Sequence, residues 1–236
     1  MTMPTGAARV TVYDQDLHWF GPVLEEWTKM IARYSQRVTN TPGNPDDPDA
    51  AYWHCEKTLV SMLHAAAWRR DCPAIVEVHS GADVAIERDA GTTSRYGLLD
   101  LYVMSEDGER HLFLEAKLEH RRHLDRASAT QVADAQWRET RTQLSEWRRR
   151  VQPYASFPAQ SCWLSALFLG PRLPQRTEFA PPVFGARLDD GSPVALECWA
   201  PATGPAPGQA VPHDRQAAEW APGVLLLART ECFRAD

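Results

Sequence analysis

Hydrophobic residues recur every three or four positions in three segments of the chain, which is the spacing of one face of an α-helix. The pattern predicts helices over about residues 17 to 37, 48 to 70 and 124 to 151. The second of them starts at Asp47-Pro48, a pair that suits the first turn of a helix. The apolar stripe of the first helix consists of Trp19, Phe20, Leu24, Trp27 and Ile31.

Shorter apolar runs lie between and after these helices, and their length is typical of β-strands. The order helix, strands, helix, strand predicts one α/β core over residues 1–170, with a central mixed sheet flanked by helices. Residues 171–236 hold ten of the eighteen prolines and are expected to form a loop-rich extension, with one or two further strands, packed on the same domain. The expected strands are 74–80, 82–88, two within 97–120, 162–170, 194–199 and 224–229.

The two strands within 97–120 flank Asp107-Gly108, the strongest short signal for a two-residue hairpin turn. If these two residues are the centre of the turn, the numbers of paired residues add up to 215. Asp100 and Glu115 satisfy this condition, so their side chains are expected on one face with Cβ atoms about 4.5–5.5 Å apart. Because side chains alternate along a strand, Lys117 shares that face. The opposite face is expected to be a continuous core surface of Leu99, Leu101, Val103, Leu112, Leu114, Ala116 and Leu118.

Two carboxylates directly opposite one another destabilise a sheet unless a cation compensates them. Lys117 supplies one positive charge, and a hard divalent ion such as Mg²⁺ would supply more. The alternative is a salt bridge on a solvated face of the sheet. Against that alternative, the same face also carries large, mainly apolar side chains, which are not typical of a solvated face: Leu98, Tyr102, Met104 and Phe113.

A third carboxylate lies in the apolar stripe of the second predicted helix. Glu56 follows Tyr52 by four residues and precedes Val60 by four, so it is expected on the core-facing side. Burying a glutamate is costly unless it is paired or coordinated. Glu56 is therefore expected either to reach the Asp100–Glu115 pair or to extend outward at the edge of the stripe.

A helical glutamate, an aspartate on one strand and Glu-x-Lys on the next resemble the PD-(D/E)XK nuclease superfamily, which has the restriction-endonuclease-like fold. The matching residues are Glu56, Asp100 and Glu115-Ala116-Lys117, within roughly residues 48 to 170. The resemblance implies an αβββαβ core and metal-dependent phosphodiester hydrolysis. It implies that Asp100, Glu115, Glu56 and the carbonyl of Ala116 bind Mg²⁺, with Mn²⁺ as a substitute, and that Lys117 acts on the attacking water.

Two positions depart from the family pattern or match it loosely. Leu99 stands where the family motif often has proline, at a position that varies widely. Some members carry a glutamine and, four residues later, a tyrosine on the helix that follows the lysine. Gln143 with Trp147 is a loose match, and a surface position for Gln143 is the alternative.

Basic residues are concentrated between the predicted site and the end of the third helix. From Lys117 to Arg150 the local charge balance is positive, whereas the whole chain has a formal charge of −6. A local basic patch can bind phosphates even when the net charge of the whole chain is negative. The alternative is that these basic residues lie on a solvated helix face. His120 and His123 are expected at the surface. The candidate nucleic-acid-binding residues are Arg121, Arg122, Arg138, Arg141 and Arg148.

The cysteine content and the length of the apolar runs indicate the cellular compartment in which the protein works. Five scattered cysteines without a C-x-x-C pair favour a reducing cytoplasm over a disulfide framework or a zinc site. No apolar run approaches the ~20 residues of a membrane span. The sequence thus favours a cytoplasmic nuclease acting on DNA, with RNA and a homodimer left open. The second hypothesis is a catalytically silent module of the same fold that binds nucleic acid or a protein partner.

Overall fold

The computed structural model describes residues 7–39, 56–79, 98–122, 124–152, 157–158, 160–173, 179–202, 209–210, 219–220 and 222–231. Its helices are η1 (Gln15–Phe20, 3₁₀), α1 (Gly21–Thr39), α3 (Glu56–Trp68) and α4 (Arg126–Val151). Its strands are β1 (Arg9–Val12), β2 (Ala74–His79), β3 (Leu98–Met104), β4 (His111–Arg121), β5 (Ser161–Pro171), β6 (Leu196–Pro201), β7 (Gln209–Ala210), β8 (Glu219–Trp220) and β9 (Gly223–Thr230).

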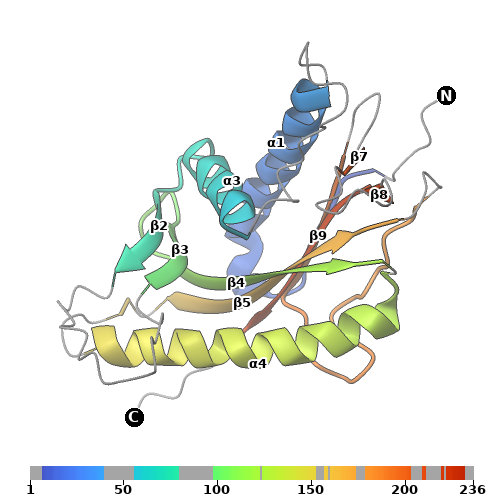
Figure 1. Cartoon of the computed structure of the whole chain (residues 1–236). Coiled ribbons are helices and arrows are strands. Elements are labelled where there is room, and N and C mark those ends of the chain that lie inside the picture. Colours follow the sequence, from blue (N-terminus) through green and yellow to red (C-terminus); the bar gives the residue numbers. More distant parts are fainter. Residues whose placement is uncertain are drawn as a thin grey trace, which may run out of the picture.

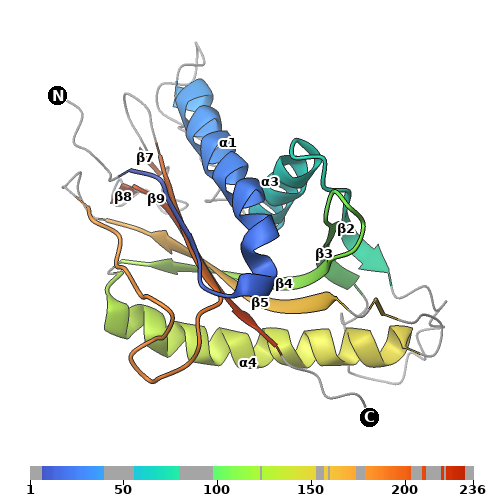
Figure 2. The ribbon, with the colours of Figure 1, turned by 180° about the vertical axis from the view of Figure 1, so that it is seen from behind.

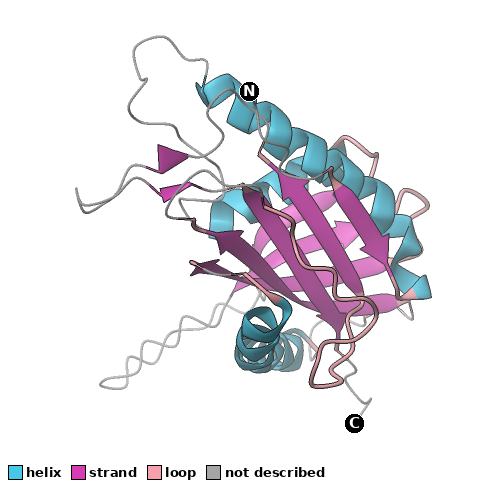
Figure 3. Ribbon diagram, turned by 90° about the vertical axis from the view of Figure 1, so that its right-hand side faces the viewer, coloured by secondary structure: helices cyan, strands magenta, loops and turns pink. Residues whose placement is uncertain are grey.

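Seven strands form one mixed sheet in the order β1-β6-β9-β5-β4-β3-β2. Only β4 and β5 pair in parallel, and the other neighbours are antiparallel. Helices α1 and α3 cover one face of the sheet, and α4 runs along the other (Figure 1). The view from behind shows the same three layers (Figure 2), and the third view shows the sheet between the two helical layers (Figure 3).

Helix α4 is the crossover that joins the parallel strands β4 and β5, as such a connection requires. A capping box begins it: the side chain of Asp125 accepts a hydrogen bond from the Ser128 amide, and Ser128 Oγ accepts one from the Asp125 amide. Its buried stripe packs against β5 and β9 through Ala133 and Trp137. Farther along, Leu144 and Trp147 pack against Phe113 and Trp163.

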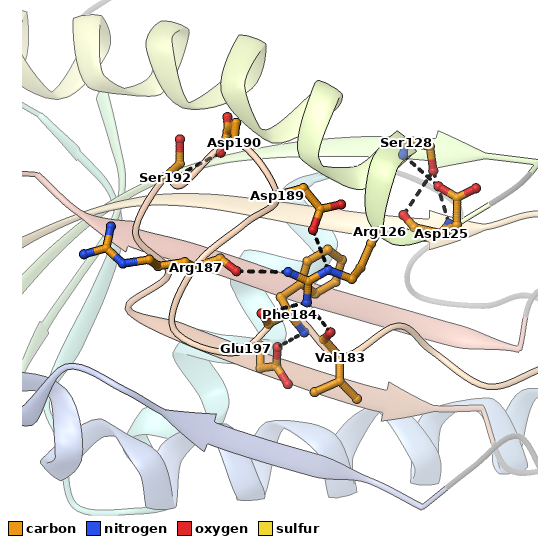
Figure 4. A network of polar contacts seen from close by, with 10 residues as sticks. All are labelled: Asp125, Arg126, Ser128, Val183, Phe184, Arg187, Asp189, Asp190, Ser192 and Glu197. Atoms are coloured by element: carbon orange, nitrogen blue, oxygen red, sulfur yellow. Dashed lines mark hydrogen bonds and ion pairs between the residues drawn. The ribbon is translucent and has the colours of Figure 1, made fainter.

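Arg126 ties the start of α4 to the loop that precedes β6 (Figure 4). Its guanidinium donates to the carbonyls of Val183 and Phe184 at 2.6 and 2.8 Å, and to a carboxylate oxygen of Asp189 at 2.7 Å. It also lies over the ring of Phe184. Deeper in the same region, Glu197 is fully buried and accepts from the amide of Phe184 at 2.8 Å. These contacts hold the irregular segment 183–189 against the sheet.

The predicted helices and most predicted strands are confirmed where the structure describes them. The strands expected at 194–199 and 224–229 are β6 and β9, and both lie inside the sheet. The strand expected at 82–88 lies outside the described residues. Strand β1, which pairs with β6 at the sheet edge, was not predicted from the sequence. The described elements from α3 to β5 follow the order αβββαβ.

The hairpin between β3 and β4 has the predicted register but a different turn. The pairs run from Leu101–Leu114 to Met104–His111, and in each the residue numbers add up to 215. The prediction of a two-residue Asp107-Gly108 turn is wrong. The amide of Gly108 donates to the carbonyl of Ser105 at 2.9 Å, so Glu106 and Asp107 are the central turn residues. Gly108 follows at φ 75°, a conformation that glycine adopts without strain. A four-residue loop has the same centre of symmetry as the two-residue loop, so the register is unchanged.

Candidate active site at the gap between two strands

The candidate site lies where β3 separates from β4. The pairing of the two strands ends at Leu101–Leu114, whereas β4 continues to Arg121 with β5 on its other side. Beyond Leu101–Leu114, the described residues of β3 form no further backbone pairs with β4. In the described part of the chain, two carboxylates take the place of the missing strand: Asp100 Oδ2 accepts from the amide of Ala116 at 2.8 Å, and the Glu56 carboxylate accepts from the backbone of Leu118.

Asp100 and Glu115 lie one position beyond Leu101–Leu114, the last pair of the two strands. Glu115 is only 6% exposed, and it accepts a hydrogen bond from the backbone of Asp100. Burial, followed by the nearby Asp100 carboxylate, raises the pKa of Glu115 from 4.5 to about 9. The pKa of Asp100 is also raised by burial, although its bond from Ala116 and the charge of Lys117 oppose that shift. At neutral pH Glu115 therefore holds a proton unless a cation replaces it.

Glu56 enters the gap from α3, on the other side of the sheet from α4. Burial raises its pKa to about 7, and the Asp100 carboxylate adds to the shift. Glu56 in turn raises the pKa of Glu115. The structure thus brings Glu56 to the Asp100–Glu115 pair, and the alternative in which it extends away at the edge of the helix stripe does not describe this arrangement.

Lys117 is a cation within the cluster, and its positive charge lowers the pKa of Glu56, Asp100 and Glu115. Its Nζ also lies 3.6 Å from a carboxylate oxygen of Glu139 on α4. One lysine therefore faces four carboxylates. Glu139 was not identified from the sequence, because nothing in an exposed helical glutamate indicates which strand residue it will face.

Gln143 lies on the flank of α4 that faces β4. Along this flank Gln136 donates to Glu119 at 2.7 Å, and Glu139 pairs with Lys117. From the first contact to the second, the residue numbers rise along α4 and fall along β4, so the helix and the strand run in opposite directions here. Gln143 lies one turn beyond Glu139 on α4, which brings it level with Glu115 on β4. Its Oε1 is buried without a hydrogen-bond partner. Trp147, the aromatic residue four positions later, is a core residue whose indole donates to the carbonyl of Val78 at 3.1 Å.

The alternation of side chains is interrupted at Asp100. Leu101 packs with the α1 and α3 residues on one face, as predicted, but Leu99 packs with Leu144 and Trp147 of α4. The prediction that Leu99 shares a face with Leu101 is wrong. The neighbouring strand β2 shows the same change, since Val76 and Val78 pack in these two different clusters. Between them Glu77 has φ 51°, which is unusual for a residue with a side chain.

The arginines proposed as phosphate contacts occupy different surroundings. Arg141 pairs with Glu231 at 3.5 Å, beyond the end of β9, and Arg138 pairs with Asp134. Both lie off the flank of α4 that faces Lys117. Arg121 lies at the end of β4, with its Nη2 3.9 Å from Glu119. Arg122 is exposed and Arg148 is half-buried. A role for these residues in binding nucleic acid stays a prediction.

The two histidines that were expected at the surface, His120 and His123, differ in what the structure describes. His123 lies outside the described residues. His120 is half-buried on β4, paired in register with Gly170 of β5. A Cβ on Gly170 would lie 2.7 Å from His120 Nδ1, so the absent side chain makes room for the ring. Burial and the charge of Arg172 lower the pKa of His120 to about 4, so the ring is neutral at physiological pH.

The donor chemistry of the gap suits a hard divalent cation. Glu56, Asp100 and Glu115 supply oxygen atoms whose negative charges oppose one another. In a β-strand, the N–H and C=O groups of one residue point toward the same neighbouring strand. The carbonyl of Ala116 therefore faces the gap, as its amide does. Among the residues described, no three His, Cys, Asp or Glu side chains are already arranged as a metal-binding group. Binding would therefore require these carboxylates to turn toward a common point.

Comparison with family models, with curated proteins and with solved structures finds no match to this chain. None of the helices in the described ranges combines the length and the apolar character needed to cross a bilayer.

Proposed function

We propose that this chain is a Mg²⁺-dependent nuclease of the PD-(D/E)XK type that hydrolyses phosphodiester bonds in DNA. The observation that carries the proposal is the convergence of Glu56, Asp100, Glu115 and Lys117, from one helix and two strands, on a single gap in the sheet. The αβββαβ order of the surrounding elements supports it. Like-charged carboxylates that raise one another's pKa are an unfavourable arrangement for stability alone.

Each residue has a role that follows from its place in the gap. Asp100 is held by the amide of Ala116 through Oδ2, which leaves Oδ1 to face a cation. Glu115 would hold that cation in its deprotonated form, and Glu56 would complete the carboxylate set from the α3 side. Lys117 would orient the attacking water and neutralise charge on the scissile phosphate. Mg²⁺ bound by these groups would polarise the phosphoryl oxygen and lower the pKa of a bound water.

A cleavage assay tests the proposal. Linear, circular, single- and double-stranded DNA are incubated with the protein and Mg²⁺ or Mn²⁺, and the products are resolved on gels. Cleavage is expected for the wild type, and Lys117→Ala and Asp100→Ala are expected to abolish it. Glu109→Gln, which removes an exposed carboxylate at the far end of the same hairpin, serves as the control.

Two results would contradict a nuclease. One is the absence of cleavage with every substrate and both metals, and the other is cleavage that survives both substitutions. DNA binding without cleavage, together with no heat of Mg²⁺ binding in calorimetry, would instead indicate the silent binding module.

A further inference from the structure

A second lysine lies beside the carboxylate cluster and is held by an ion pair. Lys57, the residue after Glu56 on α3, pairs with Glu77 on the edge strand β2. The register of β2 and β3 places Glu77 opposite Asp100, because Val76 pairs with Leu101 and Val78 with Leu99. Lys57 thus lies close enough to Asp100 for its charge to lower the pKa of that carboxyl.

The backbone of Glu77 directs its side chain toward this lysine. Val76 packs against the core residues beside α3, so a regular strand would point Glu77 to the opposite face of the sheet. Instead Glu77 has φ 51°, in the left-handed region, and its carboxylate meets Lys57 of α3. Regular pairs on both sides hold this conformation in place. Such strain at a residue that bears a side chain is most often found at functional sites.

The ion pair itself is exposed and contributes little to stability. The side chain of Lys57 is 72% exposed and that of Glu77 is 48% exposed. Water screens such a pair, and its net contribution to folding is small. The pair can therefore exchange one partner for a stronger anion at little cost. A nucleic-acid phosphate that approaches Asp100 and Lys117 would be such an anion.

We infer that Lys57 is a substrate-binding residue that contacts a backbone phosphate next to the scissile one, and that Glu77 is its resting counter-ion, displaced when substrate arrives. This inference rests on the proposed nuclease function. Lys57 would neutralise one phosphate charge while Lys117 remains beside the reacting phosphate. Until then, Glu77 would hold Lys57 in an ion pair beside the gap.

Two substitutions that break the same ion pair separate this role from a structural one. Lys57→Ala is expected to raise KM for DNA while kcat changes little, because one phosphate contact is lost. Glu77→Gln is expected to lower KM by up to about fivefold, because it releases Lys57 and removes a negative charge near the substrate. Lys57→Arg is expected to keep the wild-type KM. If the pair only ties α3 to β2, both substitutions must change KM in the same direction.

The salt dependence of kcat/KM gives a second readout that a structural role would not change. Each phosphate contact contributes about 0.9 to the slope of log(kcat/KM) against log salt for duplex DNA. Raising KCl from about 50 to 200 mM should therefore weaken the wild type about 3.5-fold more than Lys57→Ala. Lys29→Ala is the matched control, because Lys29 is an exposed lysine paired with Glu26 on α1. Its slope should equal that of the wild type.

The outcomes distinguish this inference from the proposed function. Wild-type cleavage with an unchanged salt slope in Lys57→Ala, or with equal changes of KM in Lys57→Ala and Glu77→Gln, overturns the role of Lys57 alone. A wild-type protein that neither binds nor cleaves DNA overturns both.

Discussion

Replacing Glu115 by glutamine should make the protein more stable while it removes cleavage. Glu115 is 6% exposed, and its pKa rises from 4.5 to about 9 on folding. Between these values the folded state holds a proton that the unfolded state has lost, so stability falls as pH rises from about 4.5 to about 9. At pH 7 this contribution costs about 3 kcal/mol, at about 1.4 kcal/mol for each pH unit above 4.5. Glutamine resembles the protonated form and does not titrate, so Glu115→Gln is expected to regain up to that amount.

Urea denaturation at several pH values between 5 and 9, without divalent ions, measures this effect. The stability of the wild type should decline across the range, and the decline should be shallower in Glu115→Gln. Glu109→Gln, an exposed site on the same hairpin, should reproduce the wild-type profile. Equal pH profiles for the wild type and Glu115→Gln, or a Glu115→Gln protein less stable than the wild type at pH 8, would refute the buried-carboxylate reasoning.

Three further outcomes are expected. Mg²⁺ at about 100 times its Kd should stabilise the wild type by about 2.7 kcal/mol in thermal denaturation, and Asp100→Asn should lose most of this gain. Gly223→Ala should destabilise the fold by about 3 kcal/mol or more, because the new Cβ would lie 2.4 Å from the carbonyl oxygen of Ala200; a wild-type melting temperature would contradict this. Arg126→Ala should cost about 2 kcal/mol through its lost bonds to Val183, Phe184 and Asp189, yet leave DNA cleavage unchanged. A loss of cleavage in a folded Arg126→Ala protein would show that the segment it holds contributes to the site.

Local patterns predicted the elements and the pairing of the hairpin. Helical periodicity located α1 and α4, and the apolar runs located β5, β6 and β9. The register of the hairpin from Leu101–Leu114 to Met104–His111 could be predicted because it depends only on the centre of the turn, which two- and four-residue loops share. Glu56 could be placed in the site because a glutamate inside an apolar helix stripe has few alternatives.

Features that depend on distant parts of the chain could not be predicted. The left-handed conformation of Glu77 has no sequence signal, since neighbouring strand pairs impose it on an ordinary residue. The gap between β3 and β4 begins at Asp100, where the alternation of side chains is interrupted. Glu139 and Lys57 join the site only through the packing of helices on opposite faces of the sheet. Strand β1 has four residues, too few for periodicity to separate it from a loop.

The position of β9 in the sheet has a consequence for how the protein is made. Translation reaches β9 after every other strand of the sheet, yet β9 lies between β6 and β5 and pairs with both. A nascent chain that ends before residue 223 can therefore pair β1 with β6 and β2 through β5 with one another, but it cannot join these two halves. The gap that holds Asp100 and Glu115 belongs to a half-sheet whose β5 edge stays open until β9 arrives. Such dependence on a late, distant strand favours slow folding. We expect a ribosome-bound or truncated chain that ends before residue 223 to lack the finished site, because the sheet around Asp100 and Glu115 is completed only when β9 joins it.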